Sequence, residues 1–436
     1  MSFLDELAAR RRFGMKPGLG TIRALCAELG DPQLRFGAIH VAGTNGKGAV
    51  CAILDAALRA GNVKARIGRY TSPHLVRLNE RFFLDGAPVG DAALERLSDR
   101  VSRAIEGLRR RSGPEDADVT FFEALTAVAF LLYAESSVDC AVLECGLGGR
   151  LDATNVCSPS LCVITKVGLD HCDWLGNTVE RIAAEKAGIA KPGVPVVLAH
   201  NDQPVRAVVE ARAKEVGAPF FYAPDLAEEG EIPAEFSLAG AFNRENAVTA
   251  LAALKVLSAR GGGTDARSLL PGFGKVVWPG RFQRVGRFVV DGAHNPPAAA
   301  ALAGTLRAGG FAPKSLGLIC GFCGDKDVGE VLSLLAPFVR RGLAVRTNNP
   351  RSLPAAETAA KMRAAGIDAV PCDSLDDAIE RSRRSSDRTT LVCGSLFLAG
   401  EALVALGAYP WPAGRFDPSE ALRAVGRRQP LRPASI

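Results

Sequence analysis

The chain has 436 residues, more than one typical hydrophobic core accommodates and enough for two or three domains. Its hydrophobic content of 47% and charged content of 23% are ordinary for a soluble globular protein. No apolar run reaches the roughly 18–20 residues that a membrane-spanning helix requires, and the acidic, amphipathic first residues do not resemble a signal peptide. These features argue against a secreted or membrane-spanning protein and predict a cytoplasmic one.

The cysteines and the charge also narrow the possible partners. The 11 cysteines are odd in number and scattered through apolar runs, which is typical of reduced, buried thiols. Cys320 and Cys323 form the one CxxC pair, and without a second pair this spacing is weak evidence for zinc or redox chemistry. The net charge of +6 is modest, and half of it lies in a basic, proline-rich tail over residues 407–436. Basic residues are not interleaved with aromatic ones, so we expect no nucleic-acid partner.

A glycine-rich loop is the first element with a chemical meaning. Residues 1–35 are predicted to be helical, including a helix at 21–29, and a strand follows at 37–41. The strand leads into Gly43-Thr44-Asn45-Gly46-Lys47-Gly48 and then an apolar helix, the order found in nucleotide-triphosphate sites. Backbone N–H groups of such a loop, the helix N-terminus and the lysine all attract phosphate. Gly48 stands where P-loops carry Ser or Thr, so any Mg²⁺ ligand must come from elsewhere.

Strand-like and helical segments alternate along the whole chain. In the first 280 residues, further strands are predicted at 140–143, 161–165 and 194–198, and helices at 121–134 and 179–187. After a break near 277–280, strands are predicted at 288–290, 316–320, 343–346 and 390–393, with helices starting near 296, 328, 355 and 396. The alternation predicts two doubly wound α/β domains, 1–280 and 281–436, the second being smaller and Rossmann-like. We expect the active site in the cleft between them.

Several polar residues follow predicted strands in the first domain. Ser72 can offer a hydroxyl to a metal, although its surroundings also fit an ordinary turn. Glu144 ends an apolar strand, where a carboxylate faces the ligand crevice and can hold Mg²⁺, unless it pairs with a local arginine. His171 lies beside Asp170 after the next strand and is a candidate second metal ligand or a structural histidine. Lys186 ends a helix, where a cation is also favourable without any function.

Three polar residues open the second domain. Arg281 follows Pro279-Gly280, and Asp291 and His294 lie at a strand end, so all three are expected to face the cleft between the domains.

Taken together, these residues resemble the folylpolyglutamate synthase/dihydrofolate synthase family, within the Mur ligase superfamily. The resemblance runs in family order along almost the whole chain and ends near residue 407. The stretches that carry it are 40–48, 70–77, 120–123, 143–155, 169–176, 185–189, 243–250, 279–283, 291–296 and 324–327.

The resemblance implies an ATP-dependent ligase. In this family ATP phosphorylates a substrate carboxylate, and the amino group of L-glutamate attacks the resulting acyl phosphate, so no covalent enzyme intermediate is needed. The implied acceptors are dihydropteroate and folates, and the run 151–155 resembles that of bifunctional members. The implied cofactors are ATP and Mg²⁺ at two sites, and the implied state is a monomer without membrane or nucleic-acid partners.

The resemblance also implies roles for individual residues. Those matching the ATP site are Thr44, Asn45, Gly46, Lys47, Gly48, Asn246, Arg281 and Asp291. Those matching Mg²⁺ ligands are Ser72, Glu144, His171 and Lys186, the last as a carbamate. Those expected to act in catalysis are Lys47, Lys186, Asp291 and His294. Those matching the pterin site are Lys16, Pro17, Gly18, Leu19, Thr120, Phe121, Phe122, Glu123, Leu151, Asp152 and Ala153.

Some residues depart from the family pattern or allow another interpretation. Ala49 stands where most members have Ser or Thr, and Phe242 stands near where many have His. Phe121 and Phe122 also fit the apolar start of a helix. Two alternative functions remain at this point: a Mur-like ligase acting on a different carboxylate, and a nucleotide-binding protein without ligase activity. The second is disfavoured because a binder has no chemical need for two metal sites.

Overall fold

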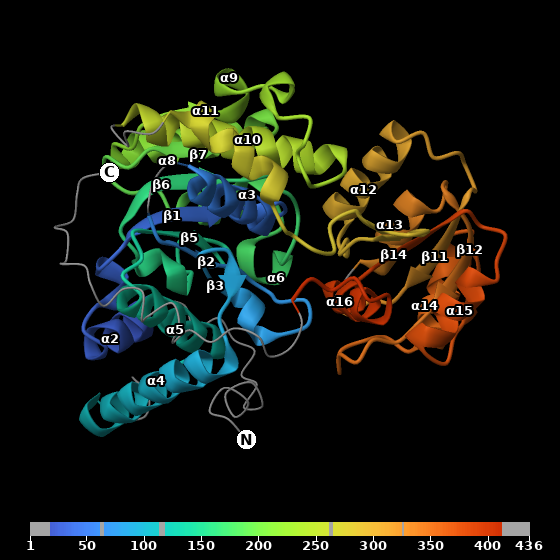
Figure 1. The fold of residues 1–436 in the computed structure, drawn as a ribbon, viewed down its shortest axis with the longest axis horizontal. Helices are drawn as coiled ribbons and strands as arrows, with labels where there is room; N and C mark the ends of the chain where they lie inside the picture. The colour runs from blue at the N-terminus through green and yellow to red at the C-terminus, as the bar shows by residue number, and fades with distance from the viewer. Residues whose placement is uncertain (1–17, 62–64, 113–117, 261–264, 325–326, 412–436) are drawn as a thin grey trace.

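The computed structural model describes residues 18–61, 65–112, 118–260, 265–324 and 327–411, and these form two α/β units (Figure 1). The first unit contains an eight-stranded sheet with the order β4-β3-β2-β5-β1-β6-β7-β8. Its strands are β1 Gly37–Ala42, β2 Ile67–Tyr70, β3 Phe82–Leu84, β4 Ala87–Pro88, β5 Cys140–Glu144, β6 Pro159–Ile164, β7 Val196–Leu198 and β8 Phe220–Tyr222. All pairings are parallel except those that add β3 and β4 at one edge.

Helices cover both faces of this sheet. They are α2 Gly20–Glu28, α3 Lys47–Ala60, α4 Asp91–Ser112, α5 Phe121–Glu135, α6 Cys172–Leu175, α7 Val179–Ala187, α8 Gln203–Val216, α9 Ala223–Leu226, α10 Ala241–Ala259 and α11 Ala266–Leu269. Short 3₁₀ turns include η2 Leu78–Arg81, η3 Ala153–Val156 and η5 Leu270–Lys275. Strand side chains alternate between faces, so Leu143 packs with α2, α4 and α5, whereas Val142 packs with α3 and α10.

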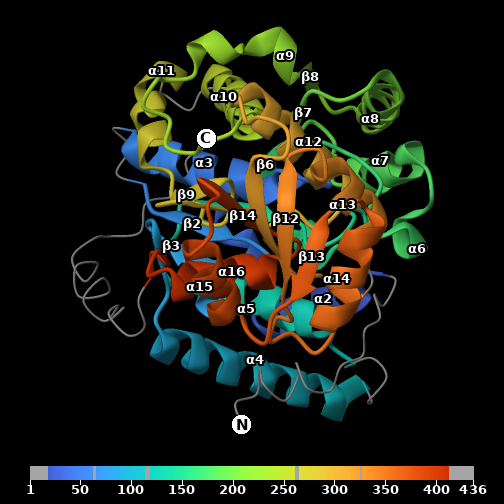
Figure 2. The same cartoon turned by 90° about the vertical axis from the view of Figure 1, so that its right-hand side faces the viewer.

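The second unit contains a six-stranded sheet with the order β13-β12-β11-β14-β10-β9. Its strands are β9 Gln283–Val285, β10 Phe288–Val290, β11 Leu316–Cys320, β12 Val339–Ala344, β13 Asp368–Pro371 and β14 Thr389–Cys393. Its helices are α12 Pro296–Ala308, α13 Val328–Leu335, α14 Ala355–Ala364, α15 Leu375–Arg383 and α16 Leu396–Ala405. Helices α12, α13 and α14 cover one face and α15 and α16 the other, as the turned view shows (Figure 2).

The fold class predicted from the sequence is confirmed, although one strand was misplaced and five short ones were missed: β3, β4, β8, β9 and β13. The strand predicted at 343–346 is wrong in its bounds, because β12 begins at Val339 and includes Arg340 and Arg341. Both arginines donate from Nε to the buried Asp387 at 2.9 Å, so their charges are paired within the strand. Strands β9 and β13 were not predicted because they are short, polar edge strands without an apolar run.

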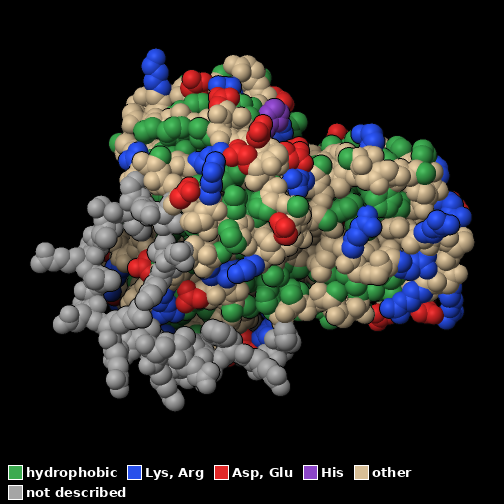
Figure 3. All heavy atoms as spheres, turned by 45° about the horizontal axis from the view of Figure 1, so that its top comes forward, with side chains coloured by type: hydrophobic (Ala, Val, Ile, Leu, Met, Phe, Trp, Pro, Cys, Tyr) green, Lys and Arg blue, Asp and Glu red, His purple; other side chains and the backbone are tan. Residues whose placement is uncertain are grey.

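None of the described helices has both the length and the apolar character needed to cross a membrane. On the face shown in Figure 3, basic and acidic side chains stand among apolar ones and do not form a continuous field of one sign.

The two units meet around the loop that carries Ser72. Glu80 accepts hydrogen bonds from the backbone N–H groups of Leu75, Val76 and Arg77 at 2.7–2.8 Å, which fixes the loop. Tyr409, after α16, donates its hydroxyl to Glu80 Oε1 at 2.6 Å. The end of the described chain follows the second unit in sequence. It nevertheless lies close to this loop of the first unit.

Gly272 offers a test of the packing that holds α3 in place. A Cβ on Gly272 would lie 2.5 Å from Ala57 Cα and would overlap the Ala56 carbonyl oxygen, both in the backbone of α3. Backbone atoms cannot move aside cheaply, so we expect Gly272→Ala to lower the free energy of unfolding by about 1–3 kcal/mol in urea titrations.

The matched control is Gly304→Ala within α12, where a Cβ meets no atom within 4 Å. This change should raise stability by roughly 0.5–1 kcal/mol, because alanine favours helix. Equal unfolding midpoints for Gly272→Ala and the unchanged protein would contradict the close packing.

Candidate active site

The glycine-rich loop between β1 and α3 is shaped for phosphate. Gly43 and Gly46 have φ angles of 148° and 88°, which other residues rarely adopt. A Cβ on Gly43 would overlap Thr165 Oγ1, and a Cβ on Gly46 would overlap Asn246 Oδ1. Glycine is therefore required here both by backbone conformation and by space. Helix α3 begins at Lys47 and is 14 residues long, so its N-terminal N–H groups and the Lys47 charge favour an anion at this point.

The segment after β6 holds the loop in this shape. Thr44 Oγ1 donates to the Gly168 carbonyl at 3.0 Å and accepts from the Gly168 N–H at 3.1 Å. Thr165 Oγ1 donates to the Asn45 carbonyl at 2.8 Å, and Lys47 Nζ donates to the Thr44 carbonyl at 3.1 Å. The N–H groups of Thr44 and Asn45 also donate to the Lys166 carbonyl, at 2.9 and 3.2 Å. A phosphate would therefore be held by the N–H groups further along, at the start of α3, rather than by those of Thr44 and Asn45.

Lys186 lies directly beneath the loop rather than in solvent. It is 3% exposed, and its Nζ donates to the Gly43 carbonyl at 2.8 Å. Burial, followed by the nearby charge of Lys47, lowers the pKa of the Lys186 amine to about 7. A large share of this amine is therefore neutral at neutral pH, and a neutral lysine amine is a nucleophile.

Glu144 lies on the other side of the loop, as the last residue of β5. Its Oε2 accepts the Ser72 N–H at 3.0 Å and would lie 3.2 Å from a Cβ on Gly48. Burial raises the pKa of this carboxyl, and the charge of Lys47 opposes that rise. A carboxylate beside a hydroxyl at a phosphate loop provides the hard oxygen ligands that Mg²⁺ prefers.

His171 is less closely engaged than the other predicted metal ligands. Its side chain is 44% exposed, and its Nε2 lies 3.9 Å from Asp170 Oδ1. Within the described ranges, no group of three or more His, Cys, Asp or Glu side chains is placed to hold a metal ion. The predicted set of Ser72, Glu144, His171 and Lys186 is thus not a closed cage of conventional ligands, and a metal here would rely on oxygens from its substrates.

Asp291, Arg281 and His294 lie at the start of the second unit. The buried Asp291 accepts the N–H groups of Phe282 and Ala293, both at 2.8 Å. Burial raises the pKa of Asp291, and the charge of Arg281 opposes that rise. His294 Nδ1 lies 2.8 Å from the Gly292 carbonyl, which can only accept, so Nδ1 carries the hydrogen and Nε2 the lone pair of the neutral ring.

An asparagine that the sequence analysis did not single out joins the two units. Asn295 caps α12 and lies 3.5 Å from the side chain of Asn45 in the phosphate loop. Its Nδ2 also donates to Asp170 Oδ2 at 2.8 Å. The structure thereby brings the 291–295 segment against the phosphate loop. The only signal in the sequence was its place between His294 and Pro296.

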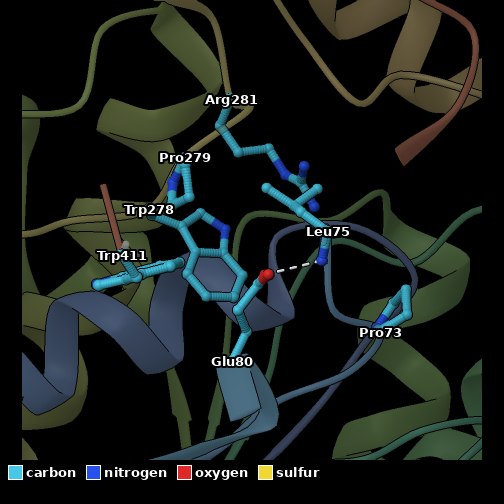
Figure 4. A pocket seen from close by; sticks show the side chains of 7 residues that line it. All are labelled: Pro73, Leu75, Glu80, Trp278, Pro279, Arg281 and Trp411. Atoms are coloured by element: carbon cyan, nitrogen blue, oxygen red, sulfur yellow. Dashed lines mark hydrogen bonds between the residues drawn. The ribbon is translucent and has the colours of Figure 1, made fainter. Parts of the chain in front are cut away.

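A tryptophan was also missed. Trp278 packs so closely on α3 that a Cβ on Gly48 would overlap its ring, and the Arg69 guanidinium lies 5.4 Å from the Trp278 ring centroid. Trp278 and Arg281 belong to the wall of a small open pocket at the junction of the units (Figure 4). The full lining is Pro73, Leu75, Glu80, Trp278, Pro279, Arg281 and Trp411. The feature of the sequence that could have drawn attention to Trp278 is a rare residue type directly before the Pro279-Gly280 break.

The residues predicted to bind the pterin fall into two groups that the fold brings together. Thr120 and Glu123 form a capping box, with Glu123 Oε2 accepting the Thr120 N–H at 2.8 Å, so their hydrogen bonds serve helix α5. Leu19, Phe121 and Phe122 are half-buried against one apolar cluster. Lys16 and Pro17 lie outside the described residues, and Gly18 is described with a φ of 123°.

Asp152 reaches the same place through a short loop. It is buried, as is Ala153, whereas Leu151 is half-buried. Leu147 N–H donates to Asp152 Oδ2 at 2.8 Å, and a Cβ on the neighbouring Gly146 would lie 2.5 Å from the tip of the Phe122 ring. The loop 146–147 thus lies between the Phe122 ring and the Asp152 carboxylate.

The two departures from the family pattern are structurally mild. Ala49 is buried in the first turn of α3, and Phe242 packs its ring against the apolar cluster of the second unit.

Comparisons with known proteins agree with this geometry. Residues 280–396 match the family model of the Mur ligase, glutamate ligase domain. The chain is 33% identical to the "Dihydrofolate synthase/folylpolyglutamate synthase" of Bacillus subtilis, over 90% of this chain and 95% of that protein. A solved Mycobacterium tuberculosis folylpolyglutamate synthase complexed with ADP superposes with a TM-score of 0.83 and 31% identity, covering 93% of this chain and 98% of that one.

A second solved relative extends the likeness to a complex with two ligands. Escherichia coli FolC in complex with DHPP and ADP superposes with a TM-score of 0.81 and 29% identity, covering 93% of this chain and 97% of that one. The chain therefore belongs to the folylpolyglutamate synthase/dihydrofolate synthase family of ATP-dependent ligases, within the Mur ligase superfamily.

Proposed function

We propose that this chain joins L-glutamate to dihydropteroate and to the γ-carboxylate of folates at the expense of ATP. The observation that carries the proposal is the meeting of the phosphate loop with the second unit through Asn45 and Asn295. A loop that only stored nucleotide would not need a second unit at its phosphate end, whereas a ligase must bring a third reactant there.

The chemistry requires positioning and charge compensation rather than a protein nucleophile. An acceptor carboxylate oxygen attacks the γ-phosphorus of ATP, an O–P bond forms, and the bond to the ADP oxygen breaks. The glutamate amine then attacks the acyl carbon, a C–N bond forms, phosphate leaves and the amine loses a proton. Lys47 and the N–H groups at the start of α3 offset the phosphoryl charge, and Arg281, Asp291 and Asn246 are assigned to ATP. His294, whose Nδ1 is held by the Gly292 carbonyl, is assigned a place close to the reacting phosphate.

Magnesium would lower the charge of the phosphates, and this chain offers it Ser72, Glu144 and His171, with Lys186 as a carbamate for a second site. The buried carboxylate at the loop fits a cation, because burial without a partner is costly for it. The low pKa of Lys186 fits carbamate formation, in which the neutral amine attacks CO₂ and releases a proton to water.

The pterin is assigned to Leu19, Phe121, Phe122, Leu151 and Asp152, which combine half-buried apolar surface with one buried carboxylate. The remaining residues assigned to this site are Lys16, Pro17, Gly18, Thr120, Glu123 and Ala153. A solved relative whose complex contains DHPP and ADP supports this assignment of a second ligand besides the nucleotide.

We further infer a division at residues 280/281 and action in the cytoplasm. Pro279 and Gly280 lie between η5 and β9, where the first unit ends and the second sheet begins. All 11 cysteines are free and ten of them are buried, which suits a reducing compartment.

The first prediction concerns the acceptor. Purified protein with Mg-ATP and glutamate should release phosphate with dihydropteroate and, separately, with tetrahydrofolate. Omitting the acceptor or the glutamate is the control, since a nucleotide-binding protein would show no dependence on either. Turnover with one acceptor alone would restrict the enzyme to one activity, and turnover with neither would favour a ligase for a different acid.

The second prediction concerns Lys47. Lys47→Ala should reduce ADP formation by at least about a hundredfold, because a full charge near the transferred phosphoryl group is lost. The matched control is Lys255→Ala on α10, where Nζ bonds Leu226 and Glu231 away from the phosphate loop. Near-unchanged turnover of Lys47→Ala would overturn the assignment of the loop.

The third prediction concerns the carbamate on Lys186. In ¹³C-bicarbonate buffer, a carbamate carbon signal should be present above pH 7 and weaken as the pH falls through about 7, because the amine becomes an ammonium ion. The signal should be absent from Lys186→Ala and present in Lys255→Ala.

The activity of Lys186→Ala provides a second test of the carbamate. Turnover should fall by at least about a hundredfold and recover in part with added short carboxylates, which replace an anionic ligand. An unmodified lysine in active, bicarbonate-equilibrated protein would contradict the carbamate.

A further inference from the structure

A buried chain of polar side chains lies behind Asp152. His40, on β1, places its Nε2 2.8 Å from Thr154 Oγ1, and Thr154 Oγ1 lies 2.5 Å from Asp152 Oδ1. Cys145 Sγ lies 3.1 Å from the same His40 nitrogen. His40, Cys145 and Thr154 are fully buried, so these contacts are not shared with solvent.

The direction of each hydrogen bond follows from Asp152. Oδ1 accepts both the N–H and the hydroxyl of Thr154, and Oδ2 accepts the N–H of Leu147. Burial raises the pKa of Asp152, and these bonds, that of the Thr154 hydroxyl first, oppose the rise and favour the carboxylate. With Asp152 as a carboxylate, the hydroxyl hydrogen of Thr154 points to Oδ1, so Thr154 accepts from His40, whose Nε2 carries the hydrogen.

The opposite direction is poorly accommodated. If Asp152 were protonated and Thr154 donated to His40, the imidazole hydrogen would move to Nδ1. That nitrogen is buried and has no hydrogen-bond partner among the described residues. A buried N–H group there would lose its bond to water without a replacement. The tautomer of His40 and the ionisation of Asp152 are therefore linked through one hydroxyl group.

The chain also connects two parts of the site. His40 lies three residues before Gly43 of the phosphate loop, in a strand whose partners on both sides are parallel. Asp152 lies beside the loop 146–147 that touches the Phe122 ring. Thr154 therefore anchors the substrate-side carboxylate to a fully buried residue of the central strand of the first unit.

We propose that Thr154 and His40 are positioning residues, which hold Asp152 as an oriented carboxylate for an N–H donor of a pterin ring. The inference rests on the proposed function, because it takes Asp152 as a contact of the pterin. It assigns no chemical step to Thr154 or His40, which act only through Asp152. A carboxylate offers about four acceptor sites. Thr154 and Leu147 use three of those of Asp152, so one ring N–H group can be accepted without loss of these bonds, and binding costs less reorganisation.

The kinetic test compares Thr154→Val, which removes the hydroxyl at similar shape, with Thr154→Ser, which keeps it. We expect Thr154→Val to raise the KM for dihydropteroate by about tenfold or more while the KM for ATP changes by less than about twofold. Thr154→Ser should restore most of the affinity. Equal increases in both KM values, or no rescue by serine, would overturn the positioning role.

A spectroscopic test needs no variant that may fold poorly. In protein labelled with ¹⁵N-histidine, His40 should show a hydrogen on Nε2 and a bare Nδ1 at neutral pH, its signals being assigned by their loss in His40→Gln. A hydrogen on Nδ1 in the unchanged protein would overturn the proposed chain of donors. Absence of turnover with dihydropteroate would overturn the proposed function and with it the role of Asp152, whereas the tautomer alone reports on the chain of hydrogen bonds.

Discussion

The placement of β1 between β5 and β6 is the constraint on which the site depends. Val41 lies opposite Glu144 in one neighbour and opposite Val163 in the other, so three parallel strands end at the same edge. The phosphate loop, the Glu144 carboxylate and the segment beginning at Thr165 are delivered to one place by backbone pairing. The strand register therefore brings these three segments together, and side-chain contacts only adjust their positions, as expected at the carboxyl edge of a parallel sheet.

Bringing charges to a buried edge is costly, and the arrangement of cations offsets part of that cost. Burial raises the pKa of Glu144 and lowers that of Lys186, so each group is pushed toward its neutral form. The charge of Lys47 lowers both pKa values. One cation beside the loop thus favours a carboxylate on one side and a neutral amine on the other, which is the combination that an oxygen ligand and a nucleophilic lysine require.

The sequence is informative about the site where local pattern and topology coincide. The loop 43–48, Glu144 at a strand end and the start of α12 were predictable because apolar runs mark the strands, and glycine or proline marks the turns and helix starts after them. The burial of Lys186 was not, because its partner Gly43 is 143 residues away and a lysine near a helix end usually faces solvent.

Contacts between distant segments account for the other omissions. The link between Asn295 and Asp170 spans 125 residues, and the fit of Trp278 against Gly48 joins the end of the first unit to its first phosphate-binding turn. No periodic pattern in the sequence predicts such contacts between distant segments. Strands β9 and β13 were missed for a different reason, since edge strands need no continuous apolar run.

The two units contact each other both at Glu80 and at Asn295, and the two contacts differ in kind. Glu80 holds the Ser72 loop through three backbone N–H groups of the first unit and also accepts the hydroxyl of Tyr409. The bonds within the first unit therefore fix the loop without the second unit. The hydroxyl of Tyr409 adds a contact that positions the second unit against this loop. Asn295, in contrast, has its bonds to Asn45 and Asp170 only while the units are together. The carboxylate side of the site is thus built into the first unit, whereas the approach of His294 depends on how the units meet.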